Sequence, residues 1–165
     1  MGLSFADLLK LHFKYLTDDY GFVVAHEIYS PMVMGNASVD FESSKTRIEI
    51  VLDRSQVLIA LGPVSWPRHE WFEFSDVVRF FAPAVDPIYV FPEDIPDHAA
   101  ALEMQVSRLA NPMRQHCDPV LRGDFSMCDG IKEVERKREA ELHQDLDRIA
   151  DRSKGRLSDQ DEGGG

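Results

Sequence analysis

The segments SVDFE (residues 38–42), RIEIVLD (47–53) and VLIAL (57–61) decide the fold of this chain. In each segment apolar side chains recur at every second position, as is typical of β-strands with one buried face. Two-residue turns at Ser44-Lys45 and Arg54-Ser55 would join them into an antiparallel meander. A shift of one residue would turn every apolar partner outward, so the register is well specified. The expected pairs are Phe41 with Ile48, Val39 with Ile50, Ile50 with Ile59, and Leu52 with Val57.

Helical patterns flank this meander on both sides. Residues 4–18 predict a helix, because Ser4 and Asp7 have capping-box spacing and Gly21 is a suitable stop. Residues 22–28 predict a further strand. Ser75 and Asp97 are candidate caps of two later helices, and Pro112 is expected to kink or break the second one. The predicted fold class is therefore α+β: an N-terminal helix, a three- or four-stranded antiparallel meander, then helices, ending in a long charged C-terminal helix.

The chain is expected to have three parts. We expect a single α+β domain over residues 1–130, a charged C-terminal helix over 131–155, and a disordered tail over 156–165. Residues 1–130 hold 10 Lys and Arg against 19 Asp and Glu, whereas residues 131–165 hold 8 against 10. The expected domain is therefore acidic, and the extension is dense in charge but almost balanced.

The net charge of −11 argues against nucleic acid and anionic membranes as partners, because both require a basic surface. No apolar run is long enough for a membrane span, and the N-terminus lacks the basic segment of a signal peptide. Two cysteines do not form a disulfide framework, which favours a cytoplasmic location. No phosphate-binding loop or metal-ligand spacing is present, so no cofactor and no metal are expected.

Asp40 and Glu49 form the most specific polar feature. In the predicted register they lie directly opposite each other, and Glu42 lies opposite Arg47. Two facing carboxylates repel, but they can share a proton or hold a divalent cation. The simpler alternative is a solvated sheet face on which the side chains splay apart.

An aromatic cluster and a cysteine are the other candidates. Trp66, Trp71 and Phe72 either form an exposed recognition surface, as aromatic residues often do at interfaces, or belong to the core, which their burial favours. Cys117, next to His116 and Asp118, is a candidate nucleophile, but an adjacent histidine on a helix points elsewhere. A buried, unreactive thiol is the favoured interpretation.

Three motifs carry a resemblance over about residues 4–140. They are FKYLTDDYGF (residues 13–22), LGP (61–63) and CDPVLRGDFS (117–126). They resemble a group of small uncharacterised bacterial proteins that share a helix ending in Tyr-Gly-Phe and a late Leu-x-Gly-Asp-Phe. In size and general fold such proteins are similar to the immunity proteins of bacterial toxin systems. The resemblance implies a protein-binding role and assigns no catalytic residue.

The sequence thus predicts a protein-binding module without catalytic residues, whose partner is another protein of basic character. The candidate binding residues are Trp66, Trp71, Phe72, Asp40 and Glu49. One alternative is a small enzyme or metal-dependent module that uses carboxylates on the sheet. A further alternative is a structural protein that forms a homo-oligomer through residues 131–155.

Overall fold

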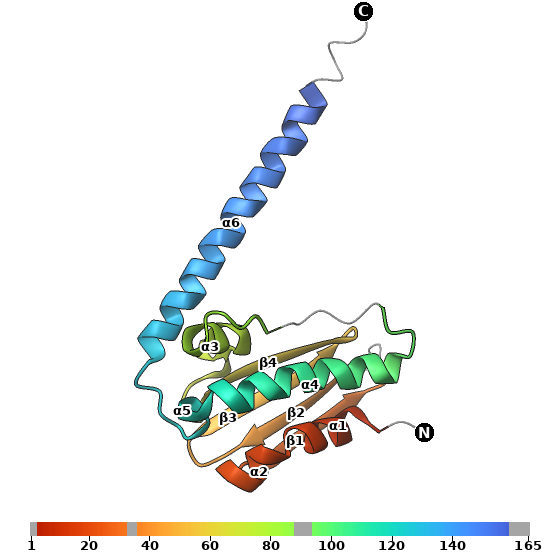
Figure 1. Ribbon diagram of the computed structural model, residues 1–165, viewed down its shortest axis with the longest axis vertical. Coiled ribbons are helices and arrows are strands. Elements are labelled where there is room, and N and C mark those ends of the chain that lie inside the picture. Colours follow the sequence, from red (N-terminus) through yellow and green to blue (C-terminus); the bar gives the residue numbers. More distant parts are fainter. Residues whose placement is uncertain (1–2, 33–35, 88–93, 159–165) are drawn as a thin grey trace, which may run out of the picture.

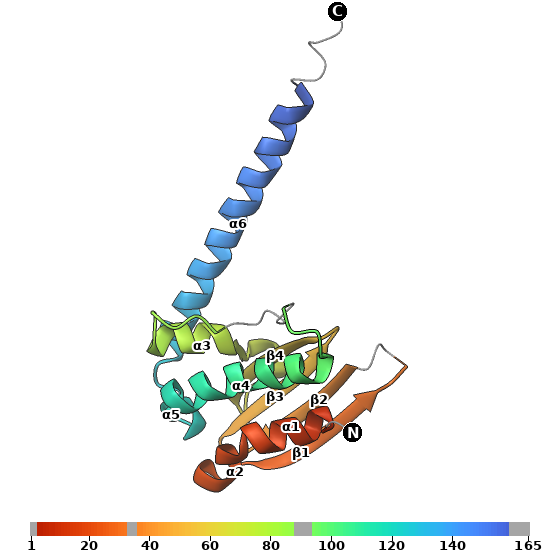
Figure 2. The same cartoon turned by 45° about the vertical axis from the view of Figure 1, so that its right-hand side comes forward.

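The computed structural model describes residues 3–32, 36–87 and 94–158, with backbone alone for 155–158. A sheet lies under a layer of helices, and one long helix projects away from both (Figures 1 and 2). The α+β class is confirmed, with an N-terminal helical region, an antiparallel sheet, later helices and a long C-terminal helix.

The sheet has five antiparallel strands in chain order, one more than the longest meander predicted. They are β1 (Val23–Ser30), β2 (Asn36–Glu42), β3 (Thr46–Asp53), β4 (Gln56–Pro63) and the two-residue β5 (Phe72–Glu73). Every predicted pair is confirmed, including Asp40 opposite Glu49 and Glu42 opposite Arg47. Arg54 and Ser55 both adopt positive φ, as a tight two-residue hairpin turn requires.

The N-terminal helical region is divided where one helix was predicted. α1 (Phe5–His12) is capped by Ser4, whose Oγ accepts a hydrogen bond from the Asp7 amide at 3.1 Å. Phe13 leaves the helical conformation and its side chain is fully buried, so core packing interrupts the helix before α2 (Lys14–Tyr20). Gly21 ends α2 in the left-handed conformation, as predicted.

Two further helices complete the cover over one face of the sheet. They are α4 (His98–His116) and the short α5 (Asp118–Leu121), and α4 lies beside α1 across the strands (Figure 1). Pro112 was expected to kink or break this helix, and it does not break it, because α4 continues through it. Leu109 and Met113 on either side are fully buried, and their packing offsets the one backbone hydrogen bond that proline cannot make.

The long C-terminal helix, α6 (Cys128–Ser158), begins against α3 (Phe74–Phe81) and then leaves the domain (Figure 2). α3 starts one residue before the predicted cap Ser75 and has no side-chain cap. Arg138 of α6 donates from Nε and Nη2 to the two carboxylate oxygens of Asp76 at 2.8 and 2.9 Å. The Asp76 side chain is 1% exposed, so this pair anchors α6 to the domain. The helix continues past Gly155, where the disordered tail was predicted to begin, and residues 159–165 of that tail lie outside the described residues.

None of the helices described has the length and apolar character needed to cross a membrane.

Candidate functional site

The strands present two different faces. One face packs its alternate residues into the core beneath α1 and α4, and it includes Val39, Phe41, Ile48, Ile50 and Leu61. The opposite face, which we call the outer face, carries the intervening residues, and most of these are half-buried or exposed. The strand pairing arranges them in rows that run across the sheet. The first row consists of His26, Asp40, Glu49 and Ala60. The second row consists of Ile28, Ser38, Val51 and Leu58.

The first row places two carboxylates in the middle of the outer face. Asp40 lies between His26 of β1 and Glu49 of β3, and Glu49 accepts hydrogen bonds from the guanidinium of Arg68. In the row next to it, Glu42 is paired with Arg47 across the β2–β3 hairpin. Both of these glutamates therefore have a cationic partner.

Asp40 differs from the other acidic residues of this hairpin in its side-chain interactions. Its carboxylate makes no hydrogen bond or ion pair within the part of the chain that the structure describes. Partial burial, and secondarily the charge of Glu49, raise the pKa of the Asp40 carboxyl above its ordinary value. An added cation at this point would lower that pKa and relieve the repulsion between the two carboxylates.

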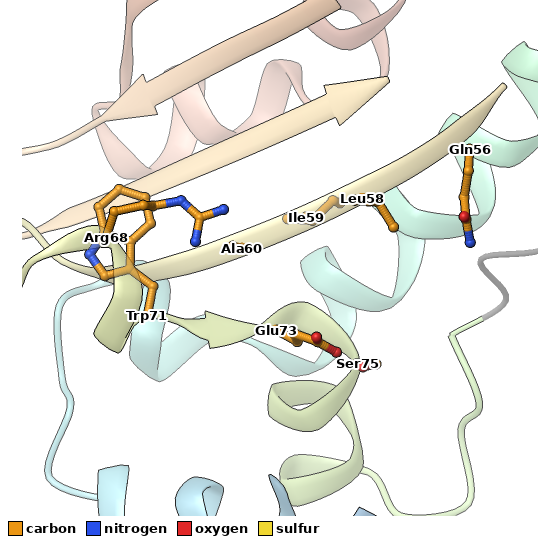
Figure 3. Close-up of a pocket in the computed structure, with 8 residues that line it drawn as sticks. All are labelled: Gln56, Leu58, Ile59, Ala60, Arg68, Trp71, Glu73 and Ser75. Atoms are coloured by element: carbon orange, nitrogen blue, oxygen red, sulfur yellow. The ribbon is translucent and has the colours of Figure 1, made fainter. Parts of the chain in front are cut away.

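A hollow of about 410 Å³ adjoins this row over β4, and Figure 3 shows its lining. Arg68 and Trp71 lie together at one end and Gln56 lies at the other (Figure 3). The Arg68 guanidinium stacks on the Trp71 ring at 5.1 Å from its centroid, so Trp71 and Glu49 hold the same arginine. Trp71 is held close to β4 because Gly62 beneath it has no side chain. A Cβ at that position would lie 2.5 Å from the indole.

The other predicted aromatic residues point into the core. Phe72 is 1% exposed and pairs with Leu61 on the buried face. Trp66 packs against the ring of Phe72 at 5.7 Å and lies under the ammonium of Lys132 from α6. Of the five predicted binding residues, Asp40, Glu49 and Trp71 share the outer face, whereas Trp66 and Phe72 do not.

Three of the four residues in the second row are apolar, although the row lies on the outer face and includes Ser38. Ile28 is 58% exposed, Leu58 is 41% exposed, and Val51 between them is half-buried. The sequence contains the signal for this row, since Val51 and Leu58 interrupt the alternation of the meander with outward apolar residues. Arg68 was not predicted from the sequence, because no local pattern relates an arginine in the short 3-10 helix η1 (Arg68–Glu70) to a carboxylate 19 residues away.

A second hollow, of about 490 Å³, opens on the helical side of the sheet. Apolar side chains from α1, α4 and the first three strands form most of its wall, including Phe5, Val39 and Leu102. Its lining includes few polar residues, among them Ser4 and Glu27.

The Cys117 region has the features of core rather than of an active site. The Cys117 side chain is fully buried, and burial raises the pKa of its thiol to about 12. A nucleophilic cysteine requires the opposite shift. Within residues 3–32, 36–87 and 94–158, no group of three or more His, Cys, Asp or Glu side chains is arranged to hold a metal ion.

The projecting part of α6 carries a short apolar stripe. Every side chain from Glu139 to Lys154 is exposed, and Leu142, Leu146 and Ile149 are each more than half exposed. These three residues lie on one side of the helix, because their spacing of four and three matches its turn.

Comparison of the chain with protein-family models, curated proteins and solved structures finds no significant match.

Proposed function

We propose that this protein is a non-enzymatic binding module that holds another protein on its outer face. At the centre of that face Asp40 makes no ion pair within the described chain, whereas Glu42 and Glu49 do, and the charges of His26, Arg47 and Arg68 offset its burial only in part. A partner that supplies a lysine or arginine at this point would complete the row.

The two rows together specify the chemistry of the partner. Asp40 and Glu49 favour a cation, and Ile28, Val51 and Leu58 favour an adjoining apolar surface. Neighbouring rows on one face of a strand lie about 7 Å apart, so the cation and the apolar group must be close together on the partner. The Arg68–Trp71 stack at the edge of the row contributes a flat amphipathic surface of the kind common in interfaces.

The overall charge supports the same partner. Residues 1–130 carry an excess of nine acidic residues, which would accelerate the approach of a basic protein and make its association rate fall with salt. The resemblance to immunity proteins gives the specific form of the proposal: the module is cytoplasmic, and its partner is a basic toxin that it neutralises by covering part of its surface.

A matched pair of peptides tests this proposal. Both peptides carry the same isoleucine and valine residues, and they differ only in having arginine and lysine in one and glutamate in the other. We expect the basic peptide alone to bind in a fluorescence-anisotropy titration, and we expect its affinity to fall as salt rises. Asp40→Asn should weaken it about fivefold, which corresponds to the loss of about 1 kcal/mol for one partly exposed charge pair.

Asp147→Asn is the matched control, because it removes the same charge from an exposed position on α6. Equal weakening by both variants would indicate nonspecific attraction, and equal binding of the two peptides would contradict the proposal. The metal-dependent alternative predicts a different result. A divalent cation would raise the melting temperature of the wild type, and Asp40→Asn would abolish that increase.

A further inference from the structure

The first strand of the sheet is an open edge. β1 pairs with β2 on one side and with no other strand of the described chain on the other. Seven of its eight residues are exposed, including Val23 at 62%, Ile28 at 58% and Tyr29 at 69%. Such an edge presents unpaired backbone groups to any other strand, and proteins usually protect it with charged side chains, proline, a β-bulge or a covering segment. β1 contains no lysine and no proline, and its one irregularity lies near its start and leaves His26–Ser30 regular.

We propose that two copies of this chain pair their β1 strands antiparallel to each other and form one continuous ten-stranded sheet. The proposal does not depend on the binding function assigned to the outer face. It concerns the backbone edge of β1, which shares Ile28 with the apolar part of the outer face, and the two ideas are tested by different measurements.

Two irregularities set the limits of the pairing. The β1–β2 ladder is interrupted between Val24 and His26, and Pro31 follows the last strand residue. The regular part of β1 is therefore His26–Ser30, and Ile28 is its central residue. A twofold axis at Ile28 pairs all five of these residues with their counterparts. It also places the interruption at Ala25 opposite Pro31 of the second copy, so both irregularities fall at the ends of the shared ladder.

Neighbouring registers are worse. Paired residues must lie on the same face, so the axis can move only from one residue to another along the strand. An axis at Glu27 leaves three regular pairs and sets two glutamates directly opposite each other, which is unfavourable. An axis at Tyr29 also leaves three regular pairs and brings Glu27 against Pro31.

The axis at Ile28 also matches the side chains. On the outer face Ile28 meets Ile28 of the second copy, which joins the two apolar rows that run through Val51 and Leu58. On the other face Tyr29 lies beside Glu27 of the second copy, where its hydroxyl can donate to the carboxylate. Glu27 already accepts from Lys10 at 2.9 Å, and both side chains are nearly half exposed, so the carboxylate retains room for a second donor.

The exposed stripe on α6 is the competing route to a dimer. Leu142, Leu146 and Ile149 span only about two helical turns, whereas a stable coiled coil usually requires three or four heptads. The residues that flank this stripe carry charges of both signs, so they do not favour one helix as a partner over another. The edge strand is therefore the stronger candidate, and the two routes can be separated experimentally.

Analytical ultracentrifugation over a concentration series provides the first test. We expect the wild type to form a reversible dimer, and Ile28→Lys to weaken it at least tenfold because two lysines would then face each other. Leu58→Lys makes the same change in the same row away from the edge, and Leu146→Lys makes it in the α6 stripe. Both should leave dimerisation unchanged. A wild type that stays monomeric at its highest soluble concentration, or a dimer that resists Ile28→Lys, would overturn the proposal.

Disulfide trapping tests the register. In a Cys128→Ser background, Ile28→Cys should form a cross-linked dimer on mild oxidation, because residues directly opposite each other have Cα atoms about 5 Å apart. His26→Cys or Ser30→Cys alone should not, since each would lie about 13 Å from its own copy along the strand. A mixture of those two variants should cross-link. Equal cross-linking of all three single variants would contradict this register.

Discussion

Removal of Arg138 is expected to destabilise the folded protein, because it would leave the buried carboxylate of Asp76 without its main partner. Asp76 is 1% exposed and receives two hydrogen bonds from Arg138, and the carboxylate raises the pKa of that guanidinium above its ordinary value. Loss of one partner from a fully buried pair costs about 3–5 kcal/mol. Here the Arg138 side chain is 26% exposed, and Arg79 remains 3.8 Å from Asp76, so we expect about 2–3 kcal/mol for Arg138→Met.

Urea denaturation followed by tryptophan fluorescence measures this loss. Arg136→Met is the matched control on the same helix, since Arg136 is 68% exposed and its ion pair among the described residues is with Glu133 of its own helix. This variant should lose no more than about 0.5 kcal/mol of stability. In a double-mutant cycle, Asp76→Asn and Arg138→Met together should cost clearly less than the sum of their separate effects. Additive effects, or equal costs for Arg136→Met and Arg138→Met, would refute the anchoring role of this pair.

Three further expectations concern the sheet and the core. Because the pKa of the Asp40 carboxyl is raised in the folded state, its stability contribution is present at low pH and is lost as pH rises through that pKa. Asp40→Asn should therefore stabilise the protein by about 0.5 kcal/mol at pH 7 and by nothing near pH 3, and denaturation curves that show destabilisation at pH 7 would contradict this. Cys117 should react with a thiol reagent only after the protein unfolds, whereas the half-buried Cys128 should react much sooner. Rapid labelling of both cysteines would show that Cys117 is accessible in the folded protein. Gly62→Ala should displace Trp71, destabilise the protein by about 1–3 kcal/mol and change its fluorescence, and an unchanged spectrum would disprove the close packing.

The strand register was predictable because alternation along three strands admits only one arrangement that buries every apolar partner. Asp40 opposite Glu49 followed from that register without further information. The helix end at Gly21 was also predictable, since only a few residues adopt the left-handed conformation readily.

The features that the sequence did not predict depend on contacts between distant segments. Core packing of Phe13 divides the first helical region, and buried neighbours carry α4 through Pro112. The two-residue strand β5 is too short to leave a periodic pattern, yet its pairing with β4 sends Phe72 into the core and leaves Trp71 on the outer face. Local patterns therefore could not separate the aromatic residues of the core from the one beside Glu49.

Chemical-shift mapping by NMR tests the proposed binding surface most directly. When the basic peptide is added to the ¹⁵N-labelled protein, we expect the largest amide shifts on the outer-face rows, at Asp40, Glu49, Val51 and Leu58, and we expect Asp40→Asn to reduce them. Shifts confined to the hollow beside Phe5 and Leu102, or to Leu142 and Leu146 of α6, would contradict it.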